Sequence, residues 1–222
     1  MTSLLPQPVI SLLGTSALLF EAPGDMTLST QQRIWALTQQ VQHWDGIREA
    51  VPGMNNLMVT FAVPPHDLAP LQARLIDTWA QCESLAIDGR IVELPVIYGG
   101  EEYGPHMGDV MAHTGLSIDD IVDLHSAPLY PVYALGSHPG FCYLGGMDPR
   151  LATPRRQVPI TNLPGGSVSI GGIQTGVSAS DGPSGWNTIG RTRMNFFDLT
   201  QTPPALCAPG DRIRFRIERV IR

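Results

Sequence analysis

The sequence contains no lysine, because all 14 of its basic residues are arginine. This absence excludes a P-loop of the G-x-x-x-x-G-K-[ST] type, in which a lysine reaches the phosphates of the nucleotide. It also excludes a lysine Schiff base with a carbonyl substrate or pyridoxal phosphate, and a lysine-linked biotin on this chain. A bound phosphate or carboxylate must therefore be held by arginine, hydroxyl groups or backbone N–H groups.

Charged residues are scarce, at 15% of the chain, and the formal net charge is −6. General nucleic-acid binding requires a basic surface, so it is not expected here. No apolar run approaches the length of about 18 residues that a membrane-spanning helix needs. Residues 1–20 are apolar but lack the basic region of a secretory signal. The 3 cysteines are widely spaced without a CxxC pair, which is typical of reduced thiols. We therefore expect a cytoplasmic protein.

Strand and helix patterns alternate over residues 1–98. Apolar residues at helical spacing predict two helices, at about 29–44 and 67–82. Apolar runs, the clearest of them strictly alternating, predict strands at 16–21, 47–51, 57–63 and 91–98. The order β-α-β-β-α-β is that of a ferredoxin-like α+β domain. We expect this domain to span 1–98, with a boundary near 98–104.

Residues 99–222 have a different pattern. Two short helices are predicted over 105–113 and 117–125, the second with a capping box in which Asp120 stands in place of glutamate. After Pro128 the helical periodicity stops, and short apolar runs alternate with glycine and proline turns. This pattern favours a closed β barrel or a sandwich. The expected class is therefore α+β, with a β-rich second domain over 99–222.

Glycine, proline and arginine are concentrated between Gly136 and Arg193. Glycine lets a backbone approach a ligand, and arginine recognises carboxylate or phosphate. Arg155 and Arg156, joined by Arg191 and Arg193, are candidates for an anion clamp. The alternative is that these arginines are surface residues paired with carboxylates, which contribute little.

The segment 171–176, with the sequence GGIQTG, also has two interpretations. Its amides and the side chains of Gln174 and Thr175 are candidates for ligand contacts, and the alternative is a barrel turn that needs small residues. Likewise, Trp186 is a candidate for stacking on a ligand or for core packing.

Nucleophilic and metal chemistry have weaker candidates. Ser137 and His138 are adjacent, and adjacent strand residues point to opposite faces, so a histidine beside proline is more often structural. Cys142 has no basic neighbour in sequence and is expected to be an inert thiol. The other histidines show no H-x-x-x-H spacing, so no metal site is predicted.

Several motifs in this half resemble the KipI/PxpB family of carboxyltransferase-domain proteins, also described as allophanate hydrolase subunit 1-like. The longest is PGFCYLGGMDPRLATPRR over 139–156. Others are YGGEEYGP over 98–105, HTGLS over 113–117, LHSAP over 124–128, PGGSVSIGGIQTG over 164–176 and GWNTIGRT over 185–192. They occur in the family's order, and the resemblance covers nearly the whole chain.

The resemblance implies an N-terminal ferredoxin-like domain and a C-terminal cyclophilin-like β barrel. It further implies a subunit, inactive alone, of an ATP-dependent 5-oxoprolinase that hydrolyses the lactam of 5-oxoproline to L-glutamate. The implied partners are a KipA/PxpC-like subunit and a LamB/YcsF (PxpA)-like protein, and the implied cofactor is ATP with Mg for the complex, with none covalently bound to this chain. Two alternatives stay open: a KipI-like inhibitor of a sensor histidine kinase, and a subunit of a urea- or allophanate-type amidohydrolase or carboxyltransferase.

Combined with the candidates above, the resemblance gives a set of expected site residues, shared with the partner subunit. Catalytic roles are expected for Arg155, Gln174 and His138. Substrate contacts are expected from Pro139, Gly140, Phe141, Tyr143, Arg156, Gly172, Thr175, Trp186 and Arg191. The sequence departs from the family pattern at Ser137, His138, Cys142, Ile160, Asn162, Ser178 and Ala179. These positions are expected to line the cleft, which puts the substrate in question.

Overall fold

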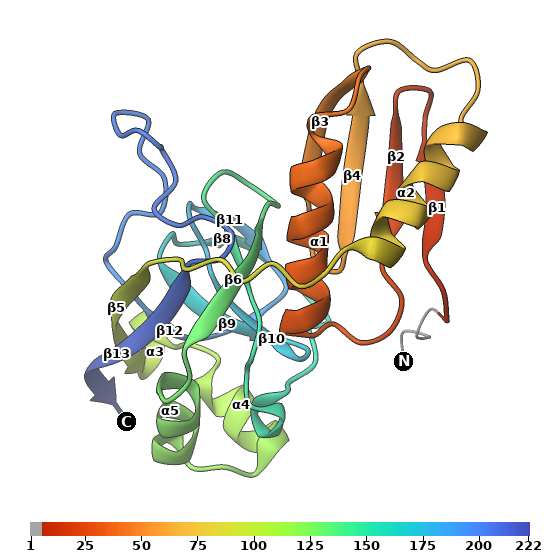
Figure 1. Cartoon of the computed structure of the whole chain (residues 1–222). Helices are drawn as coiled ribbons and strands as arrows, with labels where there is room; N and C mark the ends of the chain where they lie inside the picture. The colour runs from red at the N-terminus through yellow and green to blue at the C-terminus, as the bar shows by residue number, and fades with distance from the viewer. Residues whose placement is uncertain (1–5) are drawn as a thin grey trace. The chain divides into compact units, whose positions relative to one another are not determined.

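The computed structural model describes residues 6–222. The chain divides into two compact units, one ending at Ile87 and the other running from Asp88 to Arg222 (Figure 1). Within residues 6–222, no helix has the length and apolar character needed to cross a membrane.

The N-terminal unit is one antiparallel sheet covered by two helices (Figure 1). Its elements are β1 (Val9–Leu13), β2 (Ala17–Glu21), α1 (Leu28–Val41), β3 (Ile47–Pro52), β4 (Asn56–Phe61) and α2 (Ala69–Gln81). The sheet order is β1-β2-β4-β3. Alternate residues of β2 and β4, such as Phe20 and Val59, are buried against Leu37 of α1 and Trp79 of α2. One face of the sheet, formed by every second residue of its strands, thus packs against the apolar stripe of each helix in a single core.

This arrangement corrects the predicted β-α-β-β-α-β order. The described unit reads β-β-α-β-β-α, because β1 precedes the first expected strand and pairs with it as a hairpin. The strand expected over 91–98 exists as β5 (Ile91–Gly99), but it belongs to the second unit. The division of the chain therefore falls at Ile87, before β5, and not near 98–104.

The second unit is a closed barrel with the strand order β10-β7-β6-β13-β5-β12-β9. Besides β5, its strands are β6 (Tyr130–Leu135), β7 (Cys142–Leu144), β9 (Ser167–Gly171), β10 (Gln174–Val177), β12 (Asn187–Arg191) and β13 (Arg212–Ile221). A separate two-stranded sheet pairs β8 (Ile160–Leu163) with β11 (Gly182–Ser184). β5 lies parallel to β13 and antiparallel to β12. The expected barrel is confirmed, and β5 is needed to close it.

Short helices connect β5 to β6 (Figure 1). They are α3 (Gly100–Tyr103), α4 (Met107–Thr114) and α5 (Ile118–Ser126), and a 3-10 turn, η1 (Pro149–Leu151), follows β7. The predicted capping box is present: the Ser117 hydroxyl accepts the Asp120 N–H, and the Asp120 carboxylate accepts the Ser117 N–H. These two bonds satisfy amides that the first turn of α5 leaves unpaired.

Candidate functional site

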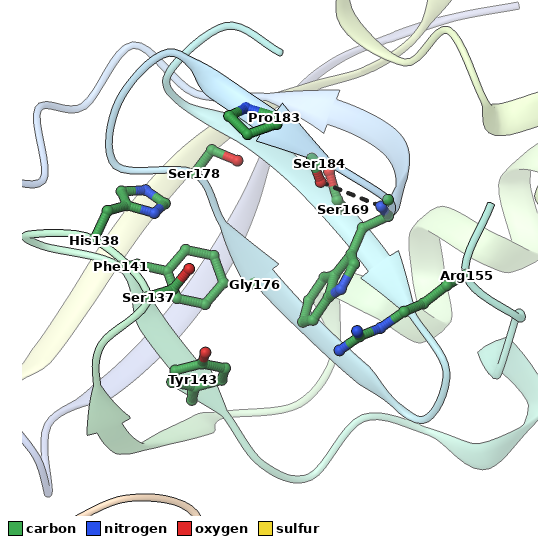
Figure 2. A pocket seen from close by; sticks show the side chains of 12 residues that line it. Ser137, His138, Phe141, Tyr143, Arg155, Ser169, Gly176, Ser178, Pro183 and Ser184 are labelled. Atoms are coloured by element: carbon green, nitrogen blue, oxygen red, sulfur yellow. Dashed lines mark hydrogen bonds between the residues drawn. The ribbon is translucent and has the colours of Figure 1, made fainter. Parts of the chain in front are cut away.

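A cavity of about 270 Å³ lies on the barrel unit, between the β6–β7 loop, strands β9 and β10, and the loop that joins β11 to β12 (Figure 2). Its walls combine aromatic rings, serine hydroxyls, one imidazole and one guanidinium. The lining residues are Ser137, His138, Phe141, Tyr143, Arg155, Ser169, Gly176, Ser178, Pro183, Ser184, Gly185 and Trp186.

Three aromatic side chains pack edge to face along the cavity. Two of them, Phe141 and Tyr143, are labelled in Figure 2. The ring centroids of Phe141 and Tyr143 are 4.9 Å apart at 75°, and those of Phe141 and Trp186 are 6.1 Å apart at 80°. Offset and edge-to-face pairs are favourable beyond the area they bury, so these rings support one another. The backbone N–H of Trp186 donates to the Ser184 hydroxyl at 3.2 Å. Trp186 thus lines the cavity and also packs against Phe141, and stacking on a ligand stays a prediction.

Glycines in the neighbouring strands make room for these rings. A Cβ atom on Gly171 would lie 2.5 Å from atoms of the Trp186 ring, closer than real Cβ contacts come. On Gly176 a Cβ would lie 3.2 Å from Phe141 and 3.3 Å from Trp186. Gly171 and Gly176 thus leave room for the aromatic wall, and Gly176 itself lines the cavity.

Arg155 is the only arginine among the residues that line this cavity. Its guanidinium carbon lies 6.0 Å from the centroid of the Trp186 ring, at the limit of a cation–π contact. Within residues 6–222, no carboxylate forms a salt bridge with it, whereas Arg150 pairs with Asp148 at 2.7 Å. An arginine beside an aromatic wall and without an internal counter-ion is suited to receiving a carboxylate from outside.

The four-arginine clamp considered from the sequence does not form. Arg156 pairs with Asp109 of α4 at 2.7 Å and lies outside the cavity lining. Arg191 donates from Nε to the Gly165 carbonyl at 3.3 Å, and with Arg193 it lines a different cavity of about 370 Å³. Tertiary pairing of loops that are far apart in sequence separates these guanidinium groups.

The expected site residues of the GGIQTG segment also lie elsewhere. Thr175 is fully buried and donates to the Ser169 carbonyl at 3.1 Å, while its hydroxyl lies 2.8 Å from Nε2 of His125. Gly172 has a φ of +65° in the β9–β10 turn, a conformation that favours glycine. Gln174 begins β10 opposite Gly171 and is not among the lining residues. The barrel-turn interpretation is therefore the one these positions support.

Pro139 and Gly140 line a neighbouring hollow with Phe197 and Ala205 instead of the cavity itself. Gly140 has a φ of +81°, and a Cβ there would lie 2.7 Å from the Phe196 carbonyl oxygen. These two residues shape the β6–β7 loop that carries His138 and Phe141.

The cavity also contains residues that the sequence did not single out for binding. Ser169, Ser178 and Ser184 contribute hydroxyl groups, and Pro183 and Gly185 complete the rim. Ser178 is one of the departures from the family pattern that are expected to line the cleft, and it does line this cavity. Serine is common in turns and strands, so no sequence signal marks a hydroxyl that faces a cavity.

His138 and its loop are held by several hydrogen bonds. The His138 N–H donates to the Gly136 carbonyl at 2.7 Å, and the Phe141 N–H donates to the His138 carbonyl at 3.1 Å. The imidazole Nε2 accepts the backbone N–H of Ala179 at 3.2 Å. Partial burial lowers the pKa of His138, because the apolar surroundings disfavour the charged ring.

Cys142 is a buried free thiol, and its hydrogen bond with Cys207 and its burial raise the pKa of this thiol, which disfavours the nucleophilic thiolate. Among residues 6–222, no group of three or more His, Cys, Asp or Glu side chains is arranged to hold a metal ion.

Comparison with known proteins identifies the family. The family model for the carboxyltransferase domain, subdomain C and D, matches residues 8–207. The chain belongs to this family. The resemblance drawn from the motifs is thereby confirmed.

Curated relatives of this carboxyltransferase-domain chain match it over nearly their full length. A protein of Escherichia coli O157:H7, named as the B-type subunit of 5-oxoprolinase, is 43% identical over 92% of this chain and 93% of its own. A protein of Bacillus subtilis (strain 168) with the same name is 33% identical over 93% of this chain and 91% of its own.

Solved structures show a similar fold within longer chains. TTHA0988 matches with a TM-score of 0.74 and 29% identity over 93% of this chain, which spans 40% of that protein. The urea amidolyase of K. lactis matches with a TM-score of 0.81 and 19% identity over 99% of this chain, which spans 16% of that enzyme. At that identity the second likeness shows the fold alone.

Proposed function

We propose that this chain is the B-type subunit of an ATP-dependent 5-oxoprolinase, which opens the lactam of 5-oxoproline to give L-glutamate. The names of the curated relatives support this proposal, because they match at 33–43% identity over most of the chain. The observation that carries it in the structure is Arg155, a guanidinium without an internal counter-ion at the edge of a small aromatic cavity.

The chemistry of the cavity suits this substrate. 5-Oxoproline is a small, nearly flat ring with one carboxylate and one lactam group. Arg155 provides a charge-assisted partner for the carboxylate. Phe141, Tyr143 and Trp186 provide faces and edges for the ring, and the serine hydroxyls and His138 provide polar partners for the lactam. A cavity of about 270 Å³ accommodates a molecule of this size.

ATP dependence is part of this proposal. Opening an unstrained five-membered lactam in water near neutral pH is uphill, so coupling to ATP would supply the driving force and activate the carbonyl. The chain has no lysine and, within residues 6–222, no ready-made magnesium site. A single guanidinium at the cavity is also too little to hold a triphosphate. We therefore assign the binding of ATP and Mg chiefly to the partner subunits.

A site shared between subunits is consistent with TTHA0988, in which this fold forms part of a longer chain. In this proposal a KipA/PxpC-like subunit completes the site, a LamB/YcsF-like protein joins the complex, and the isolated chain does not turn over. The cyclophilin-like description of the barrel is part of the same proposal.

The test is reconstitution of the three subunits and measurement of glutamate released from 5-oxoproline with and without ATP. Arg155→Gln should raise KM by about 10–100-fold, because a hydrogen bond to a charged group contributes roughly 1.5–3 kcal/mol. Arg150→Gln is the matched control, since Arg150 already pairs with Asp148 and lies outside the cavity.

Three results would contradict the proposal. They are release of glutamate without ATP, turnover by the isolated chain, and an unchanged KM in the Arg155 variant of a complex that assembles normally. Urea and allophanate are tested in parallel, and turnover of these amides in place of 5-oxoproline would support the alternative assignment.

A further inference from the structure

The imidazole of His138 is fixed in one tautomer by a backbone contact. Nε2 lies 3.2 Å from the backbone nitrogen of Ala179. An amide N–H can only donate, so Nε2 must offer its lone pair to this bond. A neutral imidazole carries one proton, and in His138 that proton must therefore be on Nδ1.

The backbone around His138 keeps the ring in this position. Ser137 has a φ of +63°, a left-handed conformation that is uncommon outside glycine. The His138 N–H and carbonyl are both used in the turn, as described above. The ring also packs against Phe141, with centroids 5.2 Å apart. Loop and ring are therefore ordered together before any ligand arrives.

The Nδ1 atom has no hydrogen-bond partner among residues 6–222, and the side chain lines the cavity. The only other charged or titratable side chains that line it are Tyr143 and Arg155. Figure 2 shows His138 and Arg155 on opposite sides, with Phe141 between them. The Trp186 ring lies between Phe141 and Arg155, with centroid contacts to both side chains. The cavity thus has two polar sides separated by aromatic rings.

We propose that His138 donates a hydrogen bond from Nδ1 to the lactam oxygen of the substrate while Arg155 holds its carboxylate, and that it does not act as a base. The identity of the ligand in this inference rests on the proposed function. A base would need a free lone pair, but Nε2 is engaged by Ala179 and Nδ1 carries the proton. A neutral donor aimed at a carbonyl oxygen stabilises the negative charge that this oxygen gains on activation. His138 then selects ligands with an acceptor oxygen opposite their carboxylate.

The tautomer is tested on the isolated full-length chain, without partner subunits. The protein is labelled with 15N-histidine, and the His138 signals are assigned by their loss in His138→Gln. At about pH 7.5, Nδ1 is expected to give a protonated, pyrrole-type shift and Nε2 an unprotonated, pyridine-type shift. An Nε2–H tautomer or a doubly protonated ring would overturn the inference, whatever the complex does.

The role is tested in the reconstituted complex with two matched variants. Asparagine places its amide N–H near the position of Nδ1 but loses the acceptor for Ala179. Glutamine places an acceptor near Nε2 but loses the Nδ1 donor. Removal of a single donor to a developing oxyanion costs about 10²–10³-fold in kcat, so His138→Gln should lose about 10²-fold, whereas His138→Asn should stay within about 10-fold of the parent.

Circular dichroism and assembly with the partners verify that both variants fold. A wild-type kcat in His138→Gln, or a loss in His138→Asn as large as that in His138→Gln, would overturn the donor role. Proline, which lacks the ring carbonyl, is expected to bind the parent and His138→Gln equally in a competition assay. A difference in proline affinity between these two proteins would also overturn the proposal. If the complex does not hydrolyse 5-oxoproline at all, the proposed function fails while the tautomer result stands.

Discussion

His125 in the centre of the barrel gives a sharp prediction about acid stability. The side chain is fully buried, with Nδ1 2.8 Å from the Tyr98 hydroxyl and Nε2 2.8 Å from the Thr175 hydroxyl. The Tyr130 hydroxyl donates to its backbone carbonyl at 2.8 Å. Burial disfavours the charged imidazole and lowers the pKa of His125 from 6.5 to about 3.

The sign of the effect follows from proton linkage. The folded-state pKa lies below the unfolded value, so the unfolded chain binds more protons between pH 6.5 and about pH 3. The stability associated with neutral His125 is therefore complete above pH 6.5 and is lost as the pH falls through this window. With these two pKa values, linkage lowers the free energy of unfolding by roughly 2–3 kcal/mol between about pH 7.5 and about pH 4.5.

This pH range separates the histidine from the carboxylates. The ion pair with Arg150 lowers the pKa of Asp148 from 3.8 to about 2, so its contribution is lost mainly below pH 3.8. Burial also lowers the pKa values of His106 and His138, so the wild-type pH dependence includes more than one histidine. Comparison with a His125 variant isolates the single site.

The assay is urea unfolding at about pH 7.5 and about pH 4.5, followed by the intensities of assigned amide signals from barrel strands β9 and β12. These signals report on the barrel alone, which matters because the chain has two compact units. His125→Gln should be less stable than the parent by about 1–3 kcal/mol near neutral pH, because it disturbs buried hydrogen bonds. Its loss of stability on acidification should be smaller than that of the parent by roughly 2–3 kcal/mol.

His113→Gln, at an exposed position of α4, controls for replacement of an imidazole as such. Equal pH dependence in the parent and His125→Gln would refute the reasoning, because the buried ring would then contribute nothing to proton linkage.

Three further predictions concern the same unit. Thr175→Val should lower the free energy of unfolding of the barrel by about 1–3 kcal/mol in urea titrations, because it leaves buried polar partners unsatisfied, and an unchanged midpoint would contradict this. Gly171→Ala should cost about 1–3 kcal/mol, because the new Cβ would clash with the Trp186 ring. It should also shift the emission of Trp186, and an unaltered spectrum with unaltered stability would show that the strand absorbs the methyl group. Arg156→Gln should change stability by less than about 1 kcal/mol, because its pair with Asp109 is partly exposed, and a double-mutant cycle giving a larger coupling would be inconsistent with this.

The sequence predicts secondary structure correctly where residues close together in the chain determine it. Strict alternation in Asn56–Phe61 gives a strand with one buried face. The polar pair Ser117 and Asp120 starts α5 in the expected way. Helix α1 ends at Val41, earlier than the predicted 44, because helix ends depend on which backbone groups are paired.

The barrel depends on pairing between strands that are far apart in sequence, so it could be predicted only in part. The apolar composition of β5 does not indicate to which unit the strand belongs. Its place is decided by pairing with β13. The contact that joins the starts of these strands, from the Arg90 N–H to the Asp211 carboxylate, spans 121 residues. No periodicity within a short window encodes a partner at such a separation.

The candidate site was likewise predicted only in part from the sequence. His138, Phe141, Tyr143, Arg155 and Trp186, all expected from the sequence, do share one cavity. Four other residues that were expected in this cavity lie outside its lining: Gln174, Thr175, Arg156 and Arg191. Residue type indicates which chemistry a side chain can perform. The direction in which the side chain points and the groups it already binds decide whether it is free to perform that chemistry.

The sequence alone therefore determined the family, the arginine-only character of any anion site, and the presence of a glycine- and aromatic-rich segment. These properties are local, because each depends on residue types and short spacings. The tertiary structure alone decided that β5 closes the barrel, that Arg155 rather than Arg156 lines the cavity, and that Ala179 fixes the tautomer of His138. Each of these depends on loops that meet only when the chain folds.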